Sequence, residues 1–141
     1  MHFVLDANEY IFGMGIFRKE SCESLIEFFL SNPSMHSVAV CRTIVEEVRD
    51  NLAPKDFQKF IKFINIFSTI DEDFLVPFES GFRYEMRGLK EADALIAAYA
   101  EWVGADALVS ENRHFLTRHS NLPFKILNAE NCLKLMRAAL Q

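Results

Sequence analysis

Short apolar runs alternate with longer amphipathic stretches along this sequence, and that alternation leaves few folds open to the chain. Four apolar runs predict one buried strand each: 3–5, 37–40, 107–110 and 124–127. Four other stretches carry apolar residues at three- and four-residue spacing, the period of a helix: 20–30, 42–52, 91–103 and 129–140. Strands that alternate with helices predict an α/β fold in which helices cover a parallel sheet.

Proline and glycine mark most of the remaining segments. Pro54 can occupy a first helical turn, and phenylalanines at helical spacing continue that helix. Pro77 opens another helix, which Gly88 ends as a C-cap. Residues 69–70 are a candidate short strand, and residues 11–16 form a glycine-punctuated loop or a turn of helix.

The size of the chain fits one ordinary domain, 1–141, because 141 residues leave little room for a second. Half of the residues are hydrophobic, which is ample material for a core. No apolar run approaches the roughly 20 residues of a membrane-spanning helix, and the N-terminus does not resemble a signal peptide. We therefore expect no membrane association and a cytoplasmic location.

The three cysteines, Cys22, Cys41 and Cys132, are not spaced as metal ligands and are predicted to be reduced thiols that act as small apolar groups. The formal net charge of −5 argues against strong non-specific binding of nucleic acid, but it allows a local basic rim. Arg83, Arg87 and Lys90 are the better candidates for such a rim.

Charged segments elsewhere have simpler explanations. Residues 71–73, Asp-Glu-Asp, are predicted to form a solvated turn. Lysines alternate with phenylalanines over 55–62, but the phenylalanine spacing is helical, so core packing with lysines on the wet face is the preferred interpretation. Arg18 and Lys19 form a second, weaker candidate for a substrate rim.

Three acids carry the functional signal, because each falls near the start of a different element. Asp6 directly follows the first strand, where functional groups gather in open α/β sheets. Glu47 borders the buried face of the helix at 42–52, whereas Glu46 points about 100° away. Asp93 lies in the first turn of the helix at 91–103. A parallel sheet could bring all three to one edge.

Each acid also has a structural alternative. Asp6 could serve only as an Asx turn or a helix cap. Glu47 and Asp93 could serve only as favourable charges near helix N-termini. If the three meet, Mg²⁺ or Mn²⁺ is the expected occupant, because these hard ions prefer oxygen ligands and relieve the repulsion between carboxylates.

At these residues the chain resembles the PIN-domain family, including the VapC-like toxin ribonucleases of toxin–antitoxin pairs. Residues 4–8 (Val-Leu-Asp-Ala-Asn) resemble its opening strand, 40–48 its second motif with Glu47 as the acid, and 89–98 its third with Asp93. Residues 108–115 resemble the fourth, a strand-to-loop turn that contains Asn112. The resemblance covers nearly the whole chain, because the closing strand and helix also fit.

The resemblance implies a three-layer α/β/α sandwich with a central parallel sheet of four to five strands. It also implies Mg²⁺- or Mn²⁺-dependent hydrolysis of RNA phosphodiester bonds, with Asp6, Glu47 and Asp93 as metal ligands and Asn112 as a further catalytic residue. A homodimer and a small antitoxin protein are the implied partners. Weaker candidates for supporting the site or contacting substrate are four polar residues: Asn8, Ser110, Glu111 and Arg113.

Two positions depart from the family pattern. The fourth motif often carries Asp where this chain has Asn112, and the adjacent Glu111 either supplies the missing charge or points elsewhere. Cys41 stands where Ser commonly caps the following helix, and cysteine caps poorly. Asn112 keeps open a different class of function: a catalytically weak or inactive PIN-like module that binds RNA or a protein. Cleavage of DNA by the same site is a third possibility.

Overall fold

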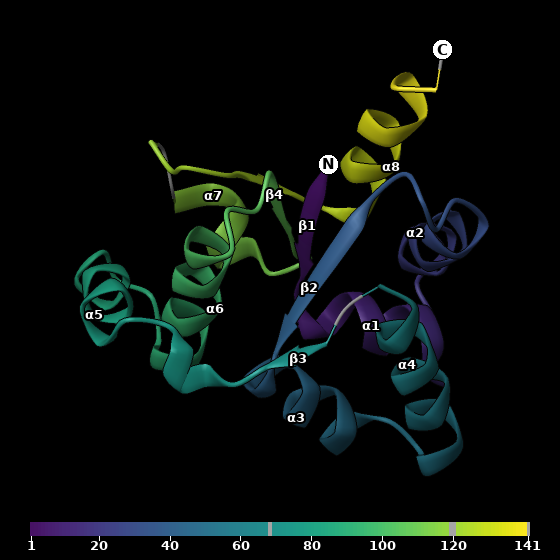
Figure 1. Ribbon diagram of the computed structural model, residues 1–141, viewed down its shortest axis with the longest axis horizontal. Helices are drawn as coiled ribbons and strands as arrows, with labels where there is room; N and C mark the ends of the chain where they lie inside the picture. The colour runs from purple at the N-terminus through teal and green to yellow at the C-terminus, as the bar shows by residue number, and fades with distance from the viewer. Residues whose placement is uncertain (68, 119–120, 141) are drawn as a thin grey trace.

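The computed structural model describes residues 1–67, 69–118 and 121–140, and it describes side chains within 1–67, 69–115 and 121–140. Its sheet has five strands in the order β3-β2-β1-β4-β5, and every neighbouring pair is parallel (Figure 1). The strands are β1 (His2–Leu5), β2 (Ser37–Cys41), β3 (Ile70–Asp71), β4 (Ala107–Val109) and β5 (Lys125–Leu127). The α/β class predicted from the sequence is therefore confirmed.

Helices cover both faces of this sheet. The helices are α1 (Ala7–Met14), α2 (Glu20–Ser31), α3 (Arg42–Asn51), α4 (Pro54–Phe67), α5 (Phe78–Met86), α6 (Glu91–Trp102), α7 (Arg113–Arg118) and α8 (Ala129–Ala138), with a 3-10 turn, η1, at Asp73–Leu75. In Figure 1, α5, α6 and α7 lie on one side of the sheet, and α1, α2, α4 and α8 lie on the other. This is the three-layer α/β/α arrangement predicted for the chain. None of the helices in the described residues is both long enough and apolar enough to span a bilayer.

Strand register determines which residues share an edge of the sheet. Leu5 pairs with Val109 across β1 and β4, and Val4 pairs with Ala39 across β1 and β2. The strands are parallel, so the residues that follow them emerge at the same edge. Helices α1 and α3 begin there, at the lower end of β1 and β2 in Figure 1.

The core joins the sheet to the aromatic faces of α1, α2 and α4. Tyr10 is fully buried and meets Phe60 and Phe63 edge-on, with ring centroids 4.7 and 5.7 Å apart. Phe3 and Phe29 meet in the same manner at 5.5 Å. The α4 lysines are exposed. The prediction that the phenylalanine stripe of this helix packs into the core is therefore confirmed.

The interpretation of residues 11–16 as a loop or a turn of helix was incomplete, because α1 already begins at Ala7. Asp6 caps this helix, and Gly13 lets it lie close to α2. A Cβ atom on Gly13 would stand only 2.9 Å from Ile26 Cγ1 and 3.1 Å from the Cys22 carbonyl oxygen. The glycine that suggested a break in the chain therefore serves helix packing instead.

The interpretation of residues 71–73 as a solvated turn was wrong. Asp71 accepts a hydrogen bond from the Tyr99 hydroxyl at 2.5 Å, and Glu72 pairs with Arg42 at 2.7 Å. Asp73 accepts the Thr43 backbone N–H at 3.0 Å and its hydroxyl at 2.7 Å. Because Cys41 makes no side-chain cap for α3, Asp73 supplies that cap from a distant part of the chain.

Candidate metal centre

Asp6 is fixed at the shared edge by both β1 and β4. Its backbone N–H donates to the Val109 carbonyl at 2.8 Å, which continues the pairing of the two strands. Its Oδ1 accepts the Ala7 N–H at 2.8 Å, and its Oδ2 accepts the Ser110 hydroxyl at 2.7 Å. The residue is only 5% exposed. Asp6 is thus a helix cap, as the structural alternative proposed, and its second oxygen is oriented by Ser110.

Asn112 links the end of β4 to Asp93. Its backbone N–H donates to the Ser110 hydroxyl at 3.0 Å, and its Oδ1 accepts the His114 N–H at 3.0 Å at the start of α7. Its Nδ2 donates to Asp93 Oδ2 at 3.4 Å. Since the oxygen serves the helix, the amide nitrogen faces the carboxylate. Asn112 therefore acts as a donor toward Asp93.

Asp93 and Glu47 approach from two further helices. Asp93 is the third residue of α6 and is half-buried, whereas Glu47 lies on the exposed side of α3. Desolvation of its carboxyl group, followed by the negative charges of Asp6 and Asp93, raises the pKa of Glu47. Glu47 therefore faces the same region as the other two acids.

The pKa of Asp6 is also raised, chiefly by burial. Hydrogen bonds from Ser110 and Ala7 lower it in part, and the charge of Asp93 raises it again. Carboxylates that repel one another in this way are stabilised by a cation. The three acids thus sense each other electrostatically, although they come from three separate elements.

Donor chemistry makes this centre suitable for Mg²⁺ or Mn²⁺, because carboxylate oxygens are the ligands that hard divalent ions prefer. Among the described residues, the only three Asp, Glu, His or Cys side chains with ligand atoms all within 4.8 Å of one another are Glu9, Cys22 and Glu111. The Asp6, Glu47 and Asp93 oxygens are thus more widely spaced as a set. That spacing still suits Mg²⁺, which retains several waters and uses one or two carboxylates directly.

Glu111 points away from Asp93, so it does not replace the missing acid of the fourth motif. Its Oε1 pairs with Lys19 Nζ at 2.8 Å, and its Oε2 accepts the Ala129 N–H at 3.0 Å. It lies instead beside Glu9, a fully buried acid that sequence reasoning missed. The spacing Asp6-Ala7-Asn8-Glu9 matches a helix-start signature, so the beginning of α1 was available as a signal.

The remaining candidates lie around the centre with less defined roles. Asn8 is half-buried in the first turn of α1, and Arg113 is exposed at the start of α7. Arg83 pairs with Glu101 at 2.8 Å, and Arg87 lies 5.8 Å from the centre of the Tyr84 ring, so neither is arranged as part of a basic rim. Lys90 is exposed and directly precedes α6.

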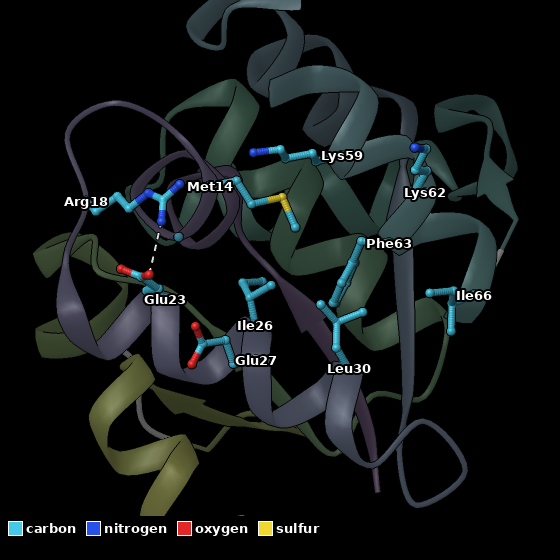
Figure 2. A pocket seen from close by; sticks show the side chains of 11 residues that line it. Met14, Arg18, Glu23, Ile26, Glu27, Leu30, Lys59, Lys62, Phe63 and Ile66 are labelled. Atoms are coloured by element: carbon cyan, nitrogen blue, oxygen red, sulfur yellow. Dashed lines mark hydrogen bonds and ion pairs between the residues drawn. The ribbon is translucent and has the colours of Figure 1, made fainter. Parts of the chain in front are cut away.

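A separate groove runs between α2 and α4 and has a volume of about 400 Å³. Figure 2 shows apolar side chains from both helices around it, among them Ile26, Leu30, Phe63 and Ile66. Charged side chains surround this apolar floor: Arg18, Glu23, Glu27, Lys59 and Lys62. Arg18 and Glu23 pair at 3.0 Å, so Arg18 belongs to this groove and is not a rim of the acidic centre.

Comparison with known proteins supports the fold. No family model matches the sequence, and no curated protein matches it significantly. Among solved structures, VapBC2 from Rickettsia felis, bound to a DNA fragment from their promoter, is similar with a TM-score of 0.63 and 18% identity, covering 91% of this chain and 98% of that chain. FitAcB from Neisseria gonorrhoeae is similar with a TM-score of 0.60 and 16% identity, covering 91% and 98%. These similarities, together with the five-stranded parallel sheet, show that the chain has the PIN-like fold predicted from its sequence.

Proposed function

We propose that this chain is a metal-dependent endoribonuclease whose centre consists of Asp6, Glu47 and Asp93, with Asn112 at its fourth corner. The observation that carries the proposal is the convergence of three carboxylates from three elements at the carboxyl edge of the sheet. Their mutual repulsion raises the pKa of Glu47 and contributes to that of Asp6. Such a site is stabilised when a divalent cation binds.

The contacts of each acid indicate its role at the centre. Asp6 is held on two sides by Ser110 and Ala7, so it offers a pre-oriented carboxylate at low cost in conformational entropy. Glu47 is exposed, so its carboxylate is accessible to a cation that enters from solvent. Bound Mg²⁺ or Mn²⁺ would be held by Asp6, Glu47 and Asp93 and would supply Lewis-acid chemistry at the phosphate together with a more acidic water.

Asn112 adjusts the centre in a different way. Because its amide donates to Asp93, it places a partial positive charge beside a carboxylate that a metal would use and competes with that metal for the oxygen. This observation also favours the second candidate, a module that binds RNA or protein without efficient catalysis. Calorimetry with Mn²⁺ distinguishes the nuclease from the binding module. A module without a functional centre binds no metal at millimolar concentration, and changing Asp6 has no effect on its calorimetric signal.

The experiment for the proposed function is metal-dependent cleavage of an RNA panel, with single- and double-stranded DNA alongside. Asp93→Asn is expected to lower cleavage at least about 100-fold, since metal-assisted stabilisation contributes several kcal/mol. Glu91→Gln, two residues earlier on the same helix, is the matched control. Retained cleavage by purified and folded Asp93→Asn would disprove the mechanism, and cleavage of DNA alone would reassign the substrate.

A toxin role, with a cytoplasmic location, rests on the family resemblance and predicts a small antitoxin protein as partner. The groove between α2 and α4 in Figure 2 supports such a partner, since its apolar floor and charged margins suit an amphipathic segment. Ile66→Asp, on the exposed margin of this groove, is expected to weaken binding of a co-expressed antitoxin without removing the acidic centre. Unchanged binding would place the antitoxin elsewhere.

An exposed aromatic surface supports the predicted homodimer. Phe74, Phe78 and Phe82 are 82, 84 and 52% exposed, and they border a groove of about 900 Å³. Apolar patches of this kind mark protein interfaces. The acids that also line the groove disfavour RNA phosphate there: Asp73, Glu85 and Glu91. Light scattering is expected to show a dimer that Phe78→Glu converts to a monomer, and a monomeric wild type at high concentration would contradict the dimer.

A further inference from the structure

A second acidic cluster lies beside the candidate centre and has a different chemical character. It consists of Glu9 on α1, Cys22 on α2 and Glu111 after β4, and one potential ligand atom from each lies within 4.8 Å of the others. Glu9 and Cys22 are fully buried, and the Glu111 side chain is 8% exposed. The cluster therefore sits inside the protein, with Lys19 as its exposed outer member.

The buried Glu9 carboxyl group has one oxygen without a partner. Its Oε2 accepts the Cys22 thiol at 3.1 Å, whereas its Oε1 is buried with no hydrogen-bond donor among the described residues. A buried carboxyl oxygen with no donor is costly. The Glu9 and Glu111 carboxyl groups lie close enough to hydrogen-bond through a shared proton, which a cation between them would replace.

We propose that Glu9, Cys22 and Glu111 form a zinc-binding site. Zn²⁺ accepts a cysteine sulfur and carboxylate oxygens together, and sites with three protein ligands leave a fourth position for water. A tetrahedral site with ordinary bond lengths places its ligand atoms about 3.3–3.7 Å apart. The 3.1 Å contact between Sγ and Oε2, and the 4.8 Å limit on the whole set, require only small side-chain adjustments. A thiolate ligand disfavours Mg²⁺.

Charge balance supports this assignment. Without metal, burial, together with the neighbouring Glu111, raises the pKa of Glu9 well above its usual range. Burial opposes ionisation of Glu111, but hydrogen bonds from Glu9, Lys19 and Ala129 outweigh it and lower that pKa. Burial also raises the pKa of the Cys22 thiol, so the metal-free cluster favours the protonated forms of Glu9 and Cys22. Zinc enters as Zn²⁺ when these two protons leave, so the net charge beside Lys19 stays the same.

The position of Glu111 gives the zinc site a structural consequence. Glu111 lies between Ser110 and Asn112, which hold Asp6 and Asp93 respectively. A bound zinc ion would therefore tie α1 and α2 to the turn that carries part of the candidate catalytic centre. The site itself does not depend on the proposed nuclease activity, because its thiol and its buried acid lie outside that centre.

Cobalt substitution tests the site directly on the whole chain. Metal-free protein is titrated with Co²⁺, and the near-ultraviolet thiolate-to-cobalt charge-transfer band is measured. The wild type is expected to show this band, and added Zn²⁺ to remove it by displacing cobalt. Cys22→Ala is expected to abolish the band, Glu9→Gln to weaken cobalt binding at least tenfold, and Cys132→Ala, another buried cysteine, to retain it.

Asp6→Asn keeps this test separate from the proposed function. Its band is expected to persist even when nuclease activity is lost, whereas loss of the band together with activity would overturn the assignment of two distinct sites. If Cys22→Ala does not fold, Cys22→Ser is used in its place and is expected to lose the band. No thiolate band in folded wild-type protein would overturn the zinc site and leave the two glutamates sharing only a proton.

Discussion

The candidate metal centre (Asp6, Glu47 and Asp93) and the buried cluster (Glu9, Cys22 and Glu111) both use residues from the start of α1 and are both contacted by the turn after β4. They differ in how their negative charge is compensated. Asp6 and Glu9 are one turn apart at the start of α1, and Ser110, Glu111 and Asn112 follow one another after β4. Ser110 and Asn112 contact the Asp6 group, whereas Glu111 contacts Lys19 on the opposite side. Successive side chains of one turn therefore serve two sites.

Burial does not distinguish the two groups, because Asp6 and Glu9 are 5% and 0% exposed. What differs is the source of compensating charge. Asp6 is held by neutral donors, the Ser110 hydroxyl and a backbone N–H, which orient a carboxylate without cancelling its charge. Glu111 is held by an ammonium group, and burial favours the protonated form of Glu9. The first group thus remains able to attract a cation from solution, while the second is neutral without one.

The largest expected effect tests which acid of α3 belongs to the candidate metal centre. Glu47→Gln is expected to lower metal-dependent RNA cleavage at least about 100-fold, since it removes a carboxylate whose pKa responds to Asp6 and Asp93. Glu46→Gln, its neighbour on the same helix, is expected to stay within about threefold. Cleavage rates at saturating Mn²⁺ measure both. Equal losses in the two variants would show that helix phase does not select the acid.

The residues of the candidate metal centre were easier to predict from the sequence than those of the buried cluster. Asp6 follows an apolar strand and Asp93 opens an Ala-rich helix, so both occupy positions with a recognisable geometry. Glu47 required only the phase of an amphipathic helix. Glu9 was missed because no helix was predicted before residues 11–16, which were interpreted as a loop or a turn of helix, and an acid outside a helix or strand has no predictable buried side.

Long-range contacts account for the other differences between prediction and structure. Asp73 caps α3 from a segment 30 residues away, and no local pattern identifies a cap supplied at that distance. Cys22 was correctly expected to be a buried reduced thiol. Its neighbours Glu9 and Glu111 come from α1 and from the turn after β4, so only the folded arrangement reveals a possible ligand set.

A smaller effect should distinguish the buried cluster from the candidate metal centre by the response of protein stability to pH. The folded-state pKa of Glu9 is raised above its ordinary value of 4.5, mainly by burial and then by Glu111. Folding therefore favours its protonated form, and stability is lost as the pH rises from about 4.5 toward the folded-state pKa. The free energy of unfolding is expected to fall by up to about 1.4 kcal/mol per pH unit in this range.

Glu9→Gln should remove that slope, because a neutral amide has no proton to lose. Urea unfolding between pH 4.5 and 8 in the presence of a chelator measures the change without metal. Glu111 acts in the opposite direction, since its lowered pKa gives stability that is lost as the pH falls. Equal slopes in wild type and Glu9→Gln would show that Glu9 is ionised in the folded protein and would remove the distinction between the two groups.

The smallest expected effect concerns the donor that Asn112 presents to Asp93. Asn112→Asp keeps an oxygen to cap α7 but replaces the amide nitrogen with a second carboxylate oxygen, which repels Asp93. The metal-free variant should be slightly less stable, and its affinity for Mn²⁺ should rise roughly tenfold, or about 1.4 kcal/mol, by calorimetry. Asn112→Ala is the control, because it loses the cap at a cost of about 0.5–2 kcal/mol and adds no ligand. Unchanged Mn²⁺ affinity in Asn112→Asp would mean that residue 112 does not face the metal. The candidate metal centre would then consist of its three carboxylates alone.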